Sequence, residues 1–160
     1  MLQFLGGNIR VKPITLDEQL CFAIYKAQKQ YNHFYAQALA PFKLTYPQYI
    51  TLLSLYEHGT MSVKQVGQTL ELDSGTLTPL MKRLEKDGWI NRKRSTEDER
   101  RVDVSLTKKA LDARDQIFEH VGSCMKLMNL PQSEYDHIKS EVARVDEHLS
   151  AIADNAYPEA

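Results

Sequence analysis

Two cysteines, Cys21 and Cys124, are the residues of this chain best suited to redox chemistry. Two thiols are too few for a disulfide framework, and no CxxC pair suggests a zinc site. A thiolate can instead attack a peroxide and become a sulfenic acid. Cys21 is a candidate for that reaction, because it lies in a stretch rich in tyrosine. The alternative is that Cys21 is a small buried hydrophobic residue in an aromatic core.

Tyrosines follow Cys21 at helical spacing. Tyr25 is four residues on, which puts it on the same face of a helix. Tyr35 also lies near that face, but it is about 21 Å from Cys21 along the axis of a straight helix. It can therefore reach a Cys21 thiol only from a second, antiparallel copy of the helix. Phenol hydroxyls that donate hydrogen bonds to the sulfur would favour the thiolate, and aromatic walls would favour an organic peroxide.

The composition predicts one globular domain without a metal or cofactor. The chain has 160 residues, of which 42% are hydrophobic and 26% charged, and its five histidines form no i, i+4 pair. No apolar run approaches the ~18 residues of a membrane span, and the N-terminal residues lack the pattern of a secretory signal. We therefore expect a cytoplasmic protein that makes no contact with a membrane.

The charge distribution points to nucleic acid more than the net charge does. The net charge is −1, yet residues 79–110 hold ten basic and six acidic side chains, which gives this segment +4 and the remainder −5. A local basic surface on a nearly neutral chain is typical of DNA-binding proteins. Helix surfaces are also often basic without binding DNA.

Capping and breaking residues predict a mainly α-helical chain with a small β-hairpin. Thr15 and Glu18 form a capping box, which predicts a helix from about Thr15 to Ala40 with Cys21 beyond its first turn. The other expected helices are at 45–57, 62–70, 73–88, 108–129 and 133–153, and the expected strands are at 89–95 and 101–107. Three helices followed by a two-stranded wing form a winged helix-turn-helix, here at residues 45–108.

The helix at 73–88 has one apolar and one polar face. Its leucines and Met81 recur at core spacing, which leaves outward Ser74, Thr76, Thr78, Lys82 and Arg83. Short hydroxyls near a helix N-terminus suit base edges and phosphates in a major groove. A helix cap and a solvated polar face explain the same residues.

The hairpin is also basic. Its cationic side chains are Arg92, Lys93, Arg94, Arg100 and Arg101. Arg100 at the tip could enter a minor groove, and Asp98 could hold its guanidinium in place. The alternative is a solvated turn with surface ion pairs of little energetic value.

With these residues in view, the sequence resembles the MarR family of winged-helix repressors, and within it the organic hydroperoxide regulators. The resemblance covers residues 20–107, about half of the chain. The matching segments are LCFAIY with Tyr35 downstream, LTYPQY, LDSGTLTPLMKRLE and DERRVDVSLT.

This resemblance implies a single MarR-like domain over residues 1–160 that forms a homodimer through helices at 15–40 and 109–155 and binds a pseudo-palindromic operator in double-stranded DNA. It implies that an organic hydroperoxide oxidises Cys21. The phenols around the reactive sulfur would be Tyr25, Tyr35 and Tyr46. The positions that match the family's DNA contacts are Ser74, Thr76 and Thr78 in the helix and Asp98 and Arg100 in the wing.

The resemblance leaves two possible roles for Cys124. It either resolves the oxidised Cys21 of the other subunit as a disulfide, or it is a structural thiol while a small cellular thiol caps Cys21. Three other functions stay open: a thiol peroxidase using Cys21, a repressor released by a small phenolic ligand with an inert Cys21, and an activator. We expect a regulator and not an enzyme.

Overall fold

The structure is a computed structural model, which describes residues 15–95 and 101–152. Two compact units make up the chain, one extending to Ile117 and the other starting at Phe118. The elements in chain order are η1 (Leu16–Glu18), α1 (Leu20–Leu39), η2 (Ala40–Phe42), α2 (Tyr46–His58), β1 (Met61–Ser62), α3 (Val63–Leu70), α4 (Ser74–Lys86), β2 (Ile90–Arg94), β3 (Val102–Leu106), α5 (Lys108–Met125), η3 (Lys126–Met128) and α6 (Gln132–Ser150).

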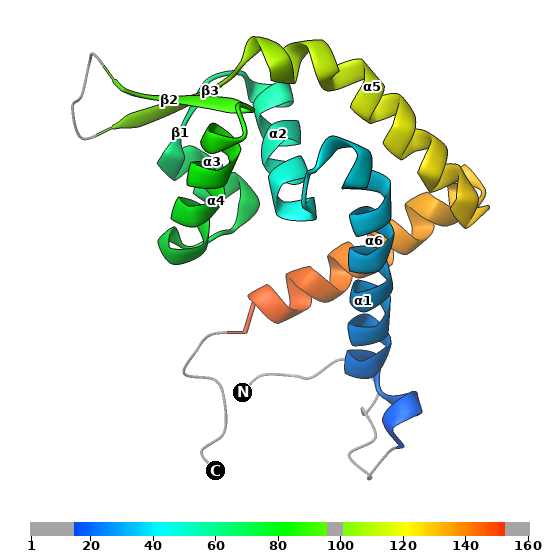
Figure 1. Cartoon of the computed structure of the whole chain (residues 1–160). Coiled ribbons are helices and arrows are strands. Elements are labelled where there is room, and N and C mark those ends of the chain that lie inside the picture. Colours follow the sequence, from blue (N-terminus) through cyan, green and yellow to red (C-terminus); the bar gives the residue numbers. More distant parts are fainter. Residues whose placement is uncertain (1–14, 96–100, 153–160) are drawn as a thin grey trace. The chain divides into compact units, whose positions relative to one another are not determined.

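The first unit has the predicted winged arrangement, with α2, α3 and α4 beside a three-stranded antiparallel sheet (Figure 1). The strand order is β1-β3-β2. The expected hairpin pairs Ile90 with Leu106 and Arg94 with Val102. The two-residue strand β1 was not predicted, and it pairs Met61 with Val104. The predicted fold class, mainly α-helical with a small β wing, is confirmed.

Local side-chain bonds start most of these helices where the sequence predicts. The N–H of Thr45 donates to Gln48 Oε1 at 2.8 Å, and the N–H of Ser62 donates to Gln65 Oε1 at 2.8 Å. The N–H of Thr76 donates to Oδ1 of Asp73, the N-cap of α4, at 3.0 Å. Such caps satisfy backbone donors that have no partner within the helix.

The first helix differs from the prediction in where it begins. The capping box forms, with the N–H of Thr15 donating to Glu18 Oε2 at 3.1 Å, but it closes only the 3-10 turn η1. Gln19 then adopts extended backbone (φ −90°, ψ 129°) and becomes the N-cap of α1. The expected start near Thr15 is therefore wrong by five residues. Cys21 is the second residue of α1, inside its first turn.

Apolar side chains from every element of the winged region form one core. The largest fully buried ones are Leu39, Leu52, Leu55, Val66, Met81, Leu84, Ile90, Val104 and Ile117. Burying a leucine or isoleucine of this kind stabilises the fold by roughly 1.5–3 kcal/mol. Leu84 and Ile90 bring α4 and β2 into this core, so the helix and the wing are held as one rigid part.

The start of α5 is tied to the same core by polar contacts. Thr107 Oγ1 donates to Gly88 O at 2.7 Å and accepts from the N–H of Ala110 at 3.2 Å. The hydroxyl of Tyr56 donates to Ala110 O at 2.6 Å. Burial raises the pKa of Tyr56 to about 12. These bonds carry the chain directly from β3 into α5.

Candidate functional site: an exposed thiol and a winged surface

Cys21 is an exposed thiol at the N-terminal end of α1. Its sulfhydryl donates to Oε1 of Gln19, the N-cap residue, at 3.4 Å. The first turn of a helix favours an anion, because its backbone N–H groups have no partner within the helix and the helix dipole is positive there. The expectation that Cys21 lies beyond the reach of this effect is therefore corrected. Gln19 was missed, and the only sequence signal for it is its place two residues before the thiol.

The predicted phenols divide into two groups in one subunit. Tyr25 lies four residues after Cys21 on α1 and is 58% exposed. Tyr35 and Tyr46 instead contact each other at the other end of α1, with ring centroids 4.6 Å apart and ring planes tilted by 40°. Because α1 is one continuous helix from Leu20 to Leu39, Tyr35 lies about 21 Å along the axis from Cys21. A single subunit therefore brings only Tyr25 near the thiol.

Tyr35 is the centre of an aromatic cluster that joins α1 to α2. Phe34 packs edge-on against the Tyr35 ring with centroids 5.2 Å apart, and the centroid of the Tyr49 ring lies 6.0 Å from that of Tyr35. Burial raises the pKa of Tyr49, and the nearby Tyr46 adds to this shift. Aromatic pairs contribute roughly 0.5–1.5 kcal/mol beyond the area they bury. The cluster therefore couples the helix that carries Cys21 to the first helix of the winged region.

Helix α4 exposes all five of the side chains that were predicted to face outward. Two of its hydroxyls also bond within the helix: Thr76 Oγ1 donates to Asp73 Oδ2 at 2.8 Å, and Thr78 Oγ1 donates to Ser74 O at 2.8 Å. Their oxygen atoms remain able to accept hydrogen bonds. Within the described part of the chain, Lys82 and Arg83 form no ion pair.

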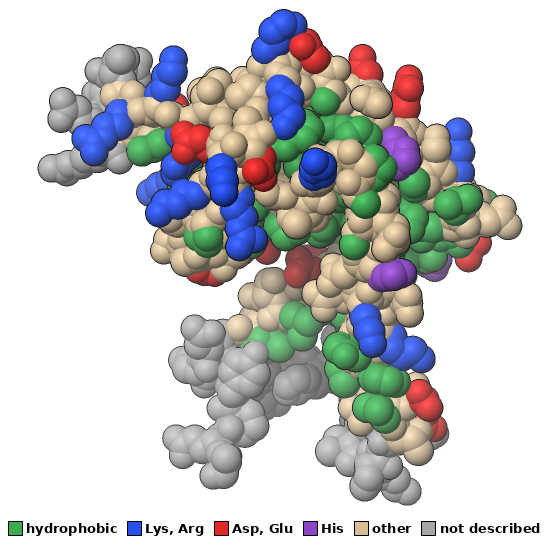
Figure 2. All heavy atoms as spheres, in the orientation of Figure 1, with side chains coloured by type: hydrophobic (Ala, Val, Ile, Leu, Met, Phe, Trp, Pro, Cys, Tyr) green, Lys and Arg blue, Asp and Glu red, His purple; other side chains and the backbone are tan. Residues whose placement is uncertain are grey.

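The wing presents cations, but not all of them face outward. Figure 2 shows Lys and Arg side chains over the hairpin and the neighbouring helices. Arg92 bonds to Glu85 of α4 through Nε at 2.9 Å and through a second nitrogen, so it fastens β2 to α4. Those bonds hold the pKa of Glu85 below its usual range. Arg94 is exposed, and the predicted pair Asp98 and Arg100 lies outside the described residues.

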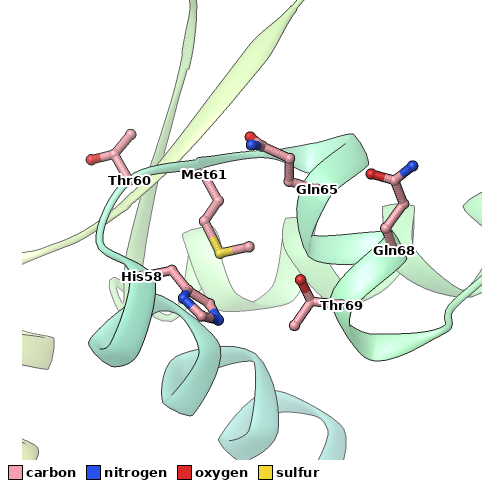
Figure 3. Close-up of a pocket in the computed structure, with 6 residues that line it drawn as sticks. All are labelled: His58, Thr60, Met61, Gln65, Gln68 and Thr69. Atoms are coloured by element: carbon pink, nitrogen blue, oxygen red, sulfur yellow. The ribbon is translucent and has the colours of Figure 1, made fainter.

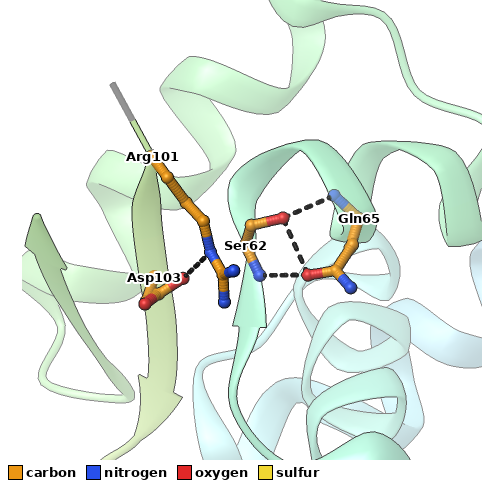
Figure 4. Close-up of polar contacts among 4 residues, drawn as sticks. All are labelled: Ser62, Gln65, Arg101 and Asp103. Atoms are coloured by element: carbon orange, nitrogen blue, oxygen red, sulfur yellow. Dashed lines mark hydrogen bonds and ion pairs between the residues drawn. The ribbon is translucent and has the colours of Figure 1, made fainter. Parts of the chain in front are cut away.

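Arg101 comes just before β3, at the loop end of the hairpin, and its side chain lies beside β1. Its Nε donates to Asp103 Oδ1 at 2.7 Å, and Figure 4 shows the guanidinium between Asp103 and Ser62. Ser62 caps α3, where its Oγ accepts from the N–H of Gln65 at 3.2 Å. The strand pairing of Ser62 with Asp103 is what brings these residues together. Sequence spacing gave no sign of this contact.

Two further features lie outside the predicted set. A pocket of about 360 Å³ lies beside α3, lined by His58, Thr60, Met61, Gln65, Gln68 and Thr69 (Figure 3). Its lining offers one imidazole and no thiol or carboxylate, so we assign it no chemistry. In the second unit, Cys124 is half-buried, with its Sγ 3.7 Å from Nε2 of His120. None of the helices in the described ranges carries an apolar run long enough to cross a bilayer.

Three helices, a wing and an exposed polar helix face define a winged helix-turn-helix protein, the architecture of many DNA-binding regulators. Residues 33–117 match the family described as transcriptional regulator SarA/Rot. The organic hydroperoxide resistance transcriptional regulator of Bacillus subtilis is 40% identical over 136 residues, which are 85% of this chain and 92% of that protein. The chain belongs to this SarA and MarR type of winged-helix transcriptional regulators.

Two other relatives are informative. TtmR of Methylorubrum extorquens is 52% identical over 100 residues, which are 62% of this chain and 51% of that protein. Reduced AbfR bound to DNA is 36% identical with a TM-score of 0.76, covering 84% of this chain and 92% of that one. Disulfide-formed AbfR is also 36% identical, with a TM-score of 0.65 and coverage of 84% and 91%. AbfR is a protein of Staphylococcus epidermidis.

Proposed function

We propose that this protein is a cytoplasmic transcriptional repressor that binds a pseudo-palindromic operator as a homodimer and leaves it when an organic hydroperoxide oxidises Cys21. The observation that carries the proposal is an exposed thiol in the first turn of α1. It occurs in a winged-helix chain that is 40% identical to an organic hydroperoxide resistance regulator.

Exposed apolar stripes support the homodimer. On α1, Leu20, Ile24 and Tyr31 recur at helical spacing and are 62%, 43% and 42% exposed. On α6, the exposed apolar residues are Tyr135, Ile138, Val142 and Leu149. Water-exposed stripes of this length on two helices are expected to be covered by another protein surface. A second copy would bring its own Tyr35 and Tyr46 toward the Cys21 that lacks them.

The chemistry at Cys21 is a two-electron oxidation of sulfur. The thiolate attacks the outer oxygen of the hydroperoxide, the O–O bond breaks, and the alkoxide takes a proton and leaves as an alcohol. The sulfur becomes a sulfenic acid. Tyr25 of the same subunit and Tyr35 and Tyr46 of the partner donate hydrogen bonds that favour the thiolate. The reaction is stoichiometric, and it serves as a signal and not as catalysis.

Release of DNA follows from movement of the dimer helices. A disulfide between Cys21 and Cys124 of opposite subunits requires Cα atoms within ~7 Å of each other. The contact between Tyr35 and Tyr46 passes that movement from α1 to α2, and the packed core carries α4 with it. Two recognition helices must lie ~34 Å apart to enter successive major grooves, so a small displacement is enough to prevent binding.

The DNA contacts proposed for each subunit are of three kinds. Ser74, Thr76 and Thr78 lie at base edges and phosphates, Lys82 and Arg83 at phosphates, and the hairpin cations along the adjacent groove. The hairpin set contains the cations Arg92, Arg94, Arg100 and Arg101, and also Asp98, which would hold the guanidinium of Arg100 in place. Within it, the pairing with Glu85 supports a positioning role for Arg92.

The test is fluorescence anisotropy on DNA from upstream of the protein's own gene, at stated salt, with wild type, Cys21→Ser and Cys124→Ser. An organic hydroperoxide should release wild type, a reductant should restore binding, and Cys21→Ser should stay bound. Release of Cys21→Ser by peroxide would overturn the proposal. Release of both proteins by a phenolic ligand, with no effect of peroxide, would identify a ligand-controlled repressor.

A further inference from the structure

His120 and Cys124 form a thiol–imidazole pair on one face of α5. The Sγ of Cys124 lies 3.7 Å from Nε2 of His120, one helical turn away, and both residues are half-buried. When the imidazole carries its hydrogen on Nδ1, the thiol donates to Nε2. The pair lies wholly within the second unit of the chain. Nothing in the chemistry proposed for Cys21 uses His120.

The location of the pair makes a neighbouring base important. Both residues lie in the last two turns of α5, which ends at Met125. The C-terminal end of a helix favours a cation and disfavours an anion. A thiolate at Cys124 therefore gains nothing from the helix, in contrast to one at Cys21 in a first turn. The imidazole of His120, 3.7 Å from the sulfur, is a base within reach that can take the proton as the sulfur attacks.

We infer that His120 accepts the proton of Cys124 when this thiol resolves oxidised Cys21, an inference that rests on the proposed function. The Cys124 sulfur attacks the Cys21 sulfur, the S–O bond breaks, and a disulfide forms. The proton lost from Cys124 passes through Nε2 of His120 to the departing hydroxide, which leaves as water. The oxidant is the organic hydroperoxide that formed the sulfenic acid, so no further reactant is needed.

Proton transfer to His120 favours a disulfide over the other products of Cys21 oxidation. Thiol attack on sulfur requires the thiolate, so the rate depends on the fraction of Cys124 that has lost its proton. With His120 in place, resolution by Cys124 outpaces capture of the sulfenic acid by small thiols. Without it, Cys21 stays longer as sulfenic acid and is open to a mixed disulfide or to further oxidation.

The experiment compares His120→Ala and His120→Gln with His137→Ala, an exposed histidine of α6 that serves as the matched control. Dimedone trapping follows the sulfenic acid, and non-reducing electrophoresis follows the disulfide. We expect both His120 variants to form sulfenic acid at the wild-type rate and the disulfide at least about tenfold more slowly. Added imidazole should restore the rate of His120→Ala, while His137→Ala should match wild type.

A second arm separates this inference from the proposed function. In full-length Cys21→Ser protein, iodoacetamide alkylates Cys124 without any role for peroxide. His120→Ala should slow this alkylation about tenfold, and imidazole should reverse the loss. One outcome is that His120→Ala slows alkylation of Cys124 while wild type forms no sulfenic acid at Cys21. This outcome would overturn the proposed function and would still support the activation of Cys124 by His120. The inference would be overturned if both His120 variants kept the wild-type rates of alkylation and disulfide formation. It would also be overturned if the slow rate of His120→Ala did not respond to imidazole.

Discussion

The rings of Tyr35 and Tyr46 contact each other with centroids 4.6 Å apart and planes tilted by 40°, which joins the C-terminal half of α1 to the first residue of α2. This contact connects the helix that carries the reactive thiol to the helix that begins the winged region. In the proposed dimer, the same two phenols face the partner's Cys21. One aromatic pair would then both sense the state of the sulfur and transmit it.

Tyr35→Phe should separate these two roles. Phenylalanine keeps the ring, so the contact with the ring of Tyr46 should remain. Loss of one hydrogen bond to a thiolate, about 1.5 kcal/mol, should slow oxidation of Cys21 by roughly tenfold. Stopped-flow oxidation by an organic hydroperoxide measures this rate. The control is Tyr31→Phe, because the ring centroid of Tyr31 lies 6.2 Å from that of Tyr35. An equal loss of rate in Tyr31→Phe would argue against a specific role for the Tyr35 hydroxyl.

The bond from Tyr56 to Ala110 should give the protein a sensitivity to alkali. The pKa of Tyr56 is about 12 in the folded state and near 10 when unfolded, so its contribution is complete below pH 10 and is lost as pH rises toward 12. Tyr56→Phe should cost about 1 kcal/mol at pH 7 and flatten that alkaline decline. Urea unfolding at pH 7 and pH 11 tests both. An unchanged decline in the variant would mean that another group causes it.

The contact between Glu85 and Arg92 should contribute stability that acid removes. Hydrogen bonds from Arg92 lower the pKa of Glu85 from 4.5, so the contribution is complete above that value and disappears as pH falls through the lowered pKa. Glu85→Gln should cost about 0.5–1 kcal/mol at pH 7, since the pair is partly exposed. Chemical unfolding should show variant and wild type converging as pH falls through the lowered pKa of Glu85. A difference that stays constant from pH 7 down through the acid range would contradict this account.

Two glycines should respond to alanine with opposite signs. At Gly67 in α3, a Cβ atom would lie 3.0 Å from Leu77 Cδ2 and 3.2 Å from Leu72 O, so Gly67→Ala should cost about 1–3 kcal/mol. At Gly122 in α5 a Cβ atom would meet nothing within 4 Å, and Gly122→Ala should stabilise by about 0.5–1 kcal/mol. Thermal unfolding of the two variants compares them. A stable Gly67→Ala protein would mean that α3 and α4 pack less tightly.

Lys82 and Arg83 should contribute to DNA affinity through phosphates. Lys82→Ala and Arg83→Ala should each weaken binding to operator and to unrelated DNA by similar factors, and each should reduce the salt-dependence slope by about 1. Anisotropy titrations at several salt concentrations give the slope. Lys29→Ala, an exposed cation of α1, is the charge-matched control and should leave the slope unchanged. Selective loss of operator binding alone would instead indicate a base contact.

Features that depend on short-range bonds could be predicted from the residue pattern. The capping residues Thr45, Ser62 and Asp73 bond within three residues of themselves, so their helices begin where the pattern predicts. Apolar spacing also predicted the exposed polar face of α4, because a helix has a fixed period. The same period placed Cys21 and Tyr25 on one face of α1.

Features that depend on contacts between residues far apart in the chain could not be predicted from that pattern. Strand β1 exists because Met61 pairs with Val104, and Arg92 faces Glu85 because the sheet packs on α4. The extended backbone at Gln19 sets the true start of α1, which moves Cys21 into a first turn. In each case, packing or backbone geometry competes with the local preference of the residues. The pattern of residue types along the chain records only the local preference.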